Sequence, residues 1–225
     1  MSRFVSQAKL LRTINYLLVI LAIVSSWSLY FLVDRRENLA IDYWMLAYLE
    51  GRQNYYLNLF SKFLYYFGDI YCAGTISAIC LAILIWRRYK QEALAFIFAT
   101  LGILIVVDNL LKPFFDRRRP PKPRLVEDLS RDSFPSGHAA GNLVLYFYIA
   151  FIVGVKYPNL RIYIYSLATI IVVLIGFGSL HTKAHWLTDI LGGYMFGYLW
   201  LILSLNLLDF IQKPNKIRGS NFKNK

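Results

Sequence analysis

The chain has 225 residues, and its 25 Lys and Arg against 13 Asp and Glu give a formal net charge of +12. It is also 57% hydrophobic and 17% aromatic, with a mean hydropathy of +0.45. This aromatic content excludes a disordered chain, and the apolar content is too high for an ordinary soluble domain. A net positive charge alone would be typical of a protein that binds nucleic acid or an acidic partner. The positions of the charges along the chain must therefore decide between these functions.

Six apolar segments approach the roughly 20 residues that a helix needs to cross a bilayer. The first is longer than a typical signal-peptide core and has no small-residue cleavage site, so we expect it to remain as a span. Residues 38–62 are apolar and aromatic but interrupted by charges, and they predict an interfacial or re-entrant helix. The sequence therefore predicts an all-α bundle with six transmembrane helices, at about residues 14–33, 64–86, 93–111, 139–155, 162–180 and 186–211.

We interpret residues 1–212 as one transmembrane domain with a core at about 64–210, followed by a basic cytoplasmic tail at 213–225. In the last span, Gly193 and Gly197 are spaced for close helix packing. With a cytoplasmic N-terminus, Lys and Arg divide almost equally between the two sides, which leaves the positive-inside rule undecided. Without residues 112–131, the cytoplasmic side has a clear excess. We therefore expect both termini in the cytoplasm and a separate role for the charges of 112–131.

The first candidate motif lies within that basic segment. Residues 112–124 carry six basic side chains and one acid, Asp116. The planar fork of arginine matches phosphate oxygens, and lysine adds a point charge. The segment predicts a phosphate site, although a solvated loop on anionic lipid headgroups would have the same composition.

The second candidate motif, Ser-Phe-Pro-Ser-Gly-His at residues 133–138, opens the fourth predicted span. Ser136 can cap the helix, and Gly137 lets backbone approach a ligand at the helix N-terminus, a natural anion site. His138 can donate a proton near neutral pH. The alternative is a capped helix with an interfacial histidine.

The third candidate motif leads into the sixth predicted span. His185 and Asp189 are four residues apart and share a helix face. A carboxylate that binds one imidazole nitrogen leaves the other free to attack, and an acid at the start of a span is costly enough to indicate function. The alternative is that the two side chains only bind each other at the helix end and have no catalytic role. His181 is interpreted as structural. Because the spans alternate in direction, all three motifs are expected on one side of the membrane.

These motifs resemble the type-2 phosphatidic acid phosphatase superfamily, which also includes the vanadium haloperoxidases, over about residues 64–210. The first family motif, Lys, six residues, Arg-Pro, is matched by Lys112, Arg119 and Pro120. The second, Pro-Ser-Gly-His, is matched by residues 135–138. The end of the third is matched by His185 and Asp189.

The third motif departs from the family in its first half. Aligned without a gap, Gly178 stands where the family has Ser, and Ser179 stands where it has a phosphate-binding Arg. Lys183 lies nearby in the sequence, and we expect it to supply the missing charge.

The resemblance implies phosphate ester or diphosphate hydrolysis without a metal or another cofactor. In it, His185 attacks phosphorus and forms a phosphohistidine, Asp189 orients His185, and His138 protonates the leaving oxygen. The residues implied to bind the substrate phosphate are Lys112, Arg119, Ser136, Gly137 and Lys183. Arg117 and Arg118 are expected to contact a second phosphate or the membrane surface.

A lipid phosphate is the expected substrate, either phosphatidate-like or a polyprenyl diphosphate such as undecaprenyl diphosphate. The resemblance implies a multi-pass protein of the bacterial inner (plasma) membrane, with an extracytoplasmic site. Its expected partners are the lipid substrate and the bilayer. Nucleic acid is disfavoured because most basic residues flank spans.

Two alternatives use the same residues: a lipid phosphotransferase, and a member that binds lipid phosphate without turnover. A transporter is less favoured because few ionisable groups lie deep in the spans. The chemistry of the soluble haloperoxidases is disfavoured by the six predicted spans.

Overall fold

We describe the protein from a computed structural model, which covers residues 20, 23–24, 39–127 and 129–220, with side chains through residue 212. Within these residues the regular structure is helical, apart from one isolated β-bridge between Arg118 and Asp132. The helices are α2 (Ala40–Glu50), α3 (Tyr55–Phe67), α4 (Ile70–Trp86), α5 (Lys90–Ile105), α6 (Lys112–Phe115), α7 (Gly137–Lys156), α8 (Arg161–His181) and α9 (Leu187–Ser220), with a π-helical turn η1 (Val106–Leu111) and a 3-10 turn η2 (Pro158–Leu160).

Four helical segments of the described chain are long and apolar enough to cross a membrane, and a bent pair adds a fifth if it counts as one span. The four lie where the third to sixth spans were predicted, and the bent pair falls on the second. The first predicted span, residues 14–33, lies outside the described residues except at 20, 23 and 24. The candidate spans are Lys90–Phe115, Gly137–Lys156, Pro158–His181 and Leu187–Gln212, with the bent pair at Tyr55–Phe67 and Ile70–Trp86.

The predicted second span, residues 64–86, is not one straight helix. α3 and α4 meet at an angle of 44°. The break falls at Gly68, where the Asn142 amide donates to the freed carbonyl at 2.7 Å. A Cβ at Gly68 would lie 2.3 Å from the Ile175 side chain of α8, so a larger residue here would force Ile175 to shift. The predicted interfacial segment, residues 38–62, forms α2 and most of α3 as two separate helices.

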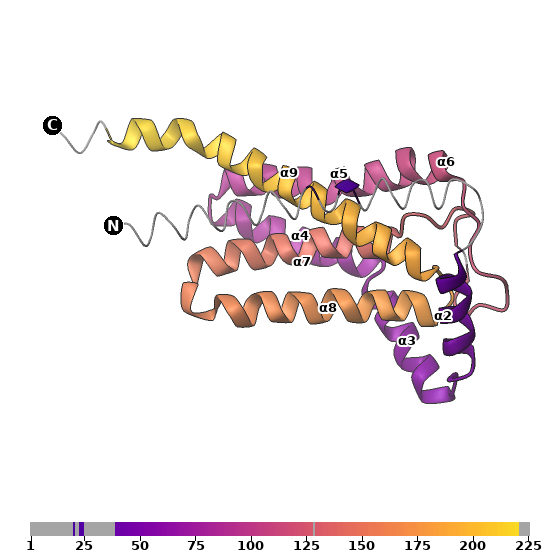
Figure 1. Ribbon diagram of the computed structural model, residues 1–225. Helices are drawn as coiled ribbons and strands as arrows, with labels where there is room; N and C mark the ends of the chain where they lie inside the picture. Colours follow the sequence, from indigo (N-terminus) through magenta and orange to yellow (C-terminus); the bar gives the residue numbers. More distant parts are fainter. Residues whose placement is uncertain (1–19, 21–22, 25–38, 128, 221–225) are drawn as a thin grey trace.

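Helix α7 is the centre of the bundle and contacts α5, α8 and α9. Figure 1 shows α4, α5, α7, α8 and α9 running along a common direction, with α2 and α3 at one end. The prediction of close packing at Gly193 and Gly197 is confirmed: a Cβ there would lie 2.6 Å from the Ser136 carbonyl and 2.8 Å from the Ala140 carbonyl. This contact holds the start of α9 against the start of α7.

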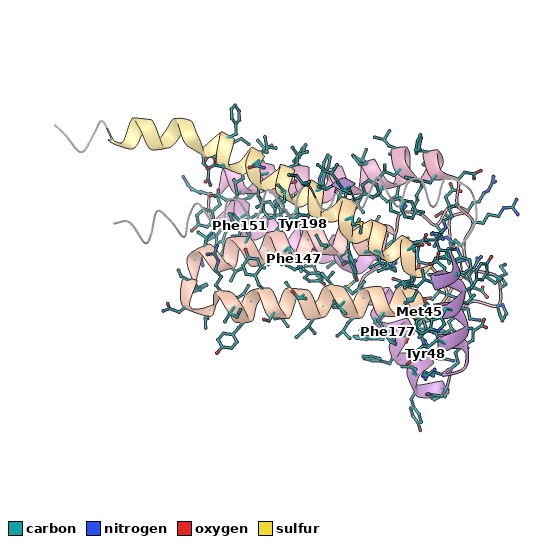
Figure 2. All side chains as sticks on the ribbon, viewed as in Figure 1. Met45, Tyr48, Phe147, Phe151, Phe177 and Tyr198 are labelled. Carbon is teal, nitrogen blue, oxygen red and sulfur yellow. The ribbon has the colours of Figure 1, made fainter. Side chains whose placement is uncertain are left out.

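The apolar core fills the middle of the bundle and leaves polar residues for the end that carries α2. Phe96 of α5 packs edge-on against Tyr148 of α7, with ring centroids 5.4 Å apart, and both are fully buried. Figure 2 places Met45 and Tyr48 of α2 with Phe177 of α8 at the α2 end, while Phe151 of α7 lies towards the other end. Helix α9 runs away from the α2 end and continues to Ser220, past the predicted domain boundary at residue 212.

Candidate active site

A cavity of about 720 Å³ opens between α3, α4, α5 and α7, and it combines a polar end with an apolar arm. The polar end contains both site histidines and two cations, listed as Lys112, Arg119, His138 and His185. The arm runs between α4 and α5 and is lined mainly by small and apolar residues, among them Ala73, Ala78, Leu81, Ile97, Leu101 and Leu104. The cavity can therefore hold a charged group at one end and an apolar chain along the other.

The basic segment reaches this cavity through an irregular helix end. The π-helical turn η1 leads directly into Lys112, whose ammonium lies 2.6 Å from Asp108 Oδ1. Wide turns of this kind are frequent at functional sites. α6 ends at Phe115, and the next residue, Asp116, takes the left-handed conformation with φ of 43° and redirects the chain.

The three consecutive arginines after this turn point in alternating directions. The backbone of Arg118 is bridged to Asp132, and neighbouring side chains of an extended segment face opposite ways. Arg117 and Arg119 are therefore buried, while Arg118 is exposed. The expectation that Arg117 contacts a second phosphate or the membrane surface is wrong, because its guanidinium binds Asp42 and Asp189 inside the protein.

Arg119 is held against the imidazole of His185. The Nη1 nitrogen of Arg119 donates to the Ala184 carbonyl at 2.6 Å and lies 3.3 Å from His185 Nε2. The rest of the guanidinium is fixed by Ser130, with Nε donating to its carbonyl at 2.6 Å and Nη2 to its hydroxyl at 3.0 Å. Burial lowers the pKa of Arg119, but a guanidinium remains charged at neutral pH.

The second motif forms the N-terminus of α7 beside these cations. Ser136 is the N-cap, and its hydroxyl accepts from the Ala139 N–H at 3.3 Å. A Cβ on Gly137 would lie 3.9 Å from the Lys112 ammonium, so the first turn of α7 and Lys112 face the same space. The helix end adds N–H donors to the positive charge, an arrangement that favours an anion.

His138 is the second residue of α7, in its first turn, and it lies against α3. Its ring stacks on Tyr65 with centroids 4.3 Å apart, and its centroid is 6.4 Å from that of His185. Among the described residues, nothing hydrogen-bonds to His138 Nε2, which is buried. An imidazole nitrogen left open at the polar end of a cavity can exchange a proton with a ligand there.

His185 and Asp189 face each other at the start of α9. His185 Nδ1 lies 3.5 Å from Asp189 Oδ2, too far to count as a hydrogen bond among the described residues, and catalytic contacts are often this long before a ligand binds. Asp189 Oδ2 also accepts from the Trp186 N–H at 2.9 Å, as acids in the first helical turn commonly do. Burial lowers the pKa of His185 to about 4 against the opposing effect of Asp189, so this imidazole is neutral at pH 7 with Nε2 towards the cavity.

Lys183 is not brought to the cavity. Its ammonium pairs with Glu50 Oε1 of α2 at 2.6 Å, and it does not line the pocket. Its position therefore argues against the expected replacement of the missing arginine. Gly178 leaves no room for a larger residue, because a Cβ there would lie 2.7 Å from Leu64 of α3. The neighbouring Ser179 donates to the Ile175 carbonyl within its own helix, at 3.1 Å.

Three residues at the site were missed in the sequence. Tyr65 lies in the segment taken as the second span, and its stacking on His138 depends on the bend that α3 and α4 make. Asp42 is an acid inside an apolar, aromatic segment, and that isolation was the available signal. Thr188 donates its backbone N–H to Asp42 at 3.0 Å, a contact between segments far apart in sequence.

Taken together, the fold and the site define a multi-pass helical membrane protein with two histidines and two cations lining a cavity at one end of its bundle. The PAP2 superfamily matches the chain over residues 92–213, which include all three motifs. The chain belongs to the PAP2 superfamily.

Two comparisons with individual proteins agree with this family. Phosphatidylglycerophosphatase B of Bacillus subtilis (strain 168) is 34% identical over 101 residues, which cover 44% of this chain and about half (49%) of that protein. The crystal structure of a transmembrane PAP2-type phosphatidylglycerolphosphate phosphatase from Bacillus subtilis matches with a TM-score of 0.73 at 24% identity. That match covers 84% of this chain and 96% of the solved chain, and it shows the shared fold.

Proposed function

We propose that the chain is a lipid phosphate phosphatase that acts through a phosphohistidine on His185. The observation that carries this proposal is the lining of the cavity, which combines two histidines and two cations with apolar residues of α4 and α5. A lipid phosphate has the same two parts, and its tail can reach the arm from the bilayer. The related enzymes named above act on phosphatidylglycerophosphate, so a lipid phosphomonoester is the first substrate to test.

The proposed first step is an in-line attack of His185 Nε2 on phosphorus. The N–P bond forms as the bond from phosphorus to the lipid oxygen breaks, and His138 donates a proton to that oxygen. Asp189 stabilises the positive charge that develops on the phosphorylated imidazole. The phosphoryl oxygens lie against Arg119, Lys112 and the Gly137 N–H at the start of α7, where fixed donors offset charge in the transition state.

The second step returns the enzyme to its starting state. A water molecule attacks the phosphohistidine, His138 accepts a proton from it, and the P–N bond breaks. Inorganic phosphate leaves, and His185 is again neutral. All charges that hold the phosphate come from the chain itself in this scheme, so we propose that turnover needs no metal.

We also propose that the site faces the extracytoplasmic side. The motifs gather at the α2 end of the bundle, whereas the C-terminal end of α9 and the α7–α8 turn lie at the other end. Arg87 and Arg88 lie in the α4–α5 turn, and Lys156 and Arg161 flank the α7–α8 turn. The positive-inside rule assigns these basic residues to the cytoplasm.

The test is phosphate release by the purified protein, in chelator, from phosphatidylglycerophosphate, phosphatidate and a polyprenyl diphosphate. Release that His185→Ala abolishes supports the proposal. Dependence on added metal, or full activity of His185→Ala, contradicts the mechanism. A phosphorylated lipid acceptor in place of free phosphate identifies a phosphotransferase, and binding without either product identifies a non-hydrolysing binder.

A further inference from the structure

A buried network links α2 to the candidate nucleophile through two ion pairs. Arg117 Nη2 lies 2.6 Å from Asp42 Oδ2, and Arg117 Nη1 lies 2.5 Å from Asp189 Oδ1. The side chains of all three residues are 3% exposed or less. A series of buried contacts therefore connects Asp42 of α2, through Arg117 and Asp189, to His185 in the active site.

Thr188 closes this network on the α9 side. Its hydroxyl donates to Asp42 Oδ2 at 2.8 Å and accepts from Arg117 Nη1 at 2.7 Å. Its backbone N–H donates to Asp42 Oδ1 at 3.0 Å. An N–H in the first turn of a helix has no partner within the helix, so Asp42 caps the start of α9 from a different helix.

The network also divides the two oxygens of Asp189 between different tasks. Oδ1 pairs with the Arg117 guanidinium, whereas Oδ2 accepts from the Trp186 N–H and faces the His185 imidazole. A carboxylate held at one oxygen by a guanidinium has little freedom to rotate away from the histidine. A second carboxylate, that of Asp42, offsets the Arg117 charge, so that Asp189 keeps negative charge for His185.

We propose that Asp42 and Arg117 are positioning residues of the reaction: they fix the Asp189 carboxylate against His185 and thereby make α2 part of the active site. The inference rests on the proposed function for the role of His185, but the contacts hold independently of the substrate. Ion pairs buried this deeply are costly to form and are weak as stabilising elements, which agrees with a functional role.

The first test is the titration of His185, because Asp42→Asn removes one negative charge with little change in shape. The loss of this negative charge disfavours the protonated imidazole of His185. The midpoint of the His185 titration is therefore expected to fall by roughly half a pH unit to one unit. The chain has three histidines, which makes assignment by NMR of carbon-13-labelled histidine direct. The charged or titratable groups around His185 are Asp189, Arg119, Lys112 and His138, and Asp42→Asn leaves all four in place.

The matched control is Glu50→Gln. It breaks the other ion pair of α2, which joins Glu50 to Lys183 of the α8–α9 connection, without touching Asp189. The His185 midpoint is expected to stay at its wild-type value. If Asp42→Asn leaves the midpoint unchanged, or Glu50→Gln moves it as far, the proposal is overturned.

The second test is kinetic and uses phosphatidylglycerophosphate in detergent micelles. Arg117→Lys keeps the charge but cannot bridge two carboxylates as the planar fork does. We expect kcat to fall about tenfold or more with KM within about twofold, because the change acts through Asp189 and not on the substrate. If Asp42→Asn fails to fold, the kinetics of Arg117→Lys decide the question, and a wild-type kcat for Arg117→Lys overturns the proposal. A wild-type protein without activity refutes the proposed function alone, since the titration is still measurable.

Discussion

Arg119 Nη1 and His185 Nε2 lie 3.3 Å apart at the polar end of the cavity. A cation beside a histidine nitrogen disfavours the protonated imidazole, and it is also the group that a phosphoryl oxygen would bind. This contact therefore adds to the effect of burial, which is the main cause of the lowered pKa of His185, and it indicates where a phosphate would bind. A phosphate bound here would accept from the Arg119 guanidinium and leave the lone pair of His185 Nε2 free to attack.

The role of His138 as acid predicts a dependence on the leaving group. His138→Gln should lower kcat for a lipid phosphomonoester by roughly 10²–10⁴-fold, because an alkoxide must be protonated as it leaves. The same variant should lose much less activity on p-nitrophenyl phosphate, whose phenolate leaves without a proton. Steady-state kinetics on both substrates measures this difference. Equal losses on both would show that His138 does not act as the acid.

The positions of Arg119 and Lys183 predict opposite results for two cation variants. Arg119→Ala should lower kcat/KM by roughly 10²–10³-fold, since it removes a fixed donor at the phosphoryl position. Lys183→Ala should leave kcat/KM within about threefold of wild type, because it removes a pair with the half-exposed Glu50 outside the cavity. A large loss for Lys183→Ala with normal thermal stability would restore it as the substitute for the missing arginine.

These results also show what could be predicted from the sequence. His138, His185 and Asp189 could be found because they lie in short motifs at helix starts, where residue order fixes their geometry. The break of residues 64–86 at Gly68 could not, because it depends on Ile175 and Asn142 of other helices. The pairing of Asp42 with Arg117 was missed for the same reason: an ion pair between residues 75 positions apart leaves no periodic signal in either segment.

The burial of His185 predicts how this residue titrates. Its NMR midpoint should lie at about 4, well below the ordinary histidine value, because burial lowers the pKa more than Asp189 raises it. The unfolded chain binds this proton near pH 6.5 and the folded chain only near 4, so His185 destabilises the fold as pH falls through that window. Unfolding of wild type and His185→Asn at pH 7 and 5 measures the effect. A midpoint near 6.5 would contradict the buried, neutral nucleophile.

The central claim is that His185 carries the phosphoryl group, and rapid mixing with phosphorus-32-labelled phosphatidylglycerophosphate followed by an alkaline quench tests it most directly. We predict base-stable, acid-labile label on the protein, located at His185 by mass spectrometry. His185→Asn should carry none, and His138→Gln should still accept label from a substrate with a good leaving group. Rapid phosphate release by wild type without labelled protein at any mixing time, or label on another residue, would contradict the claim.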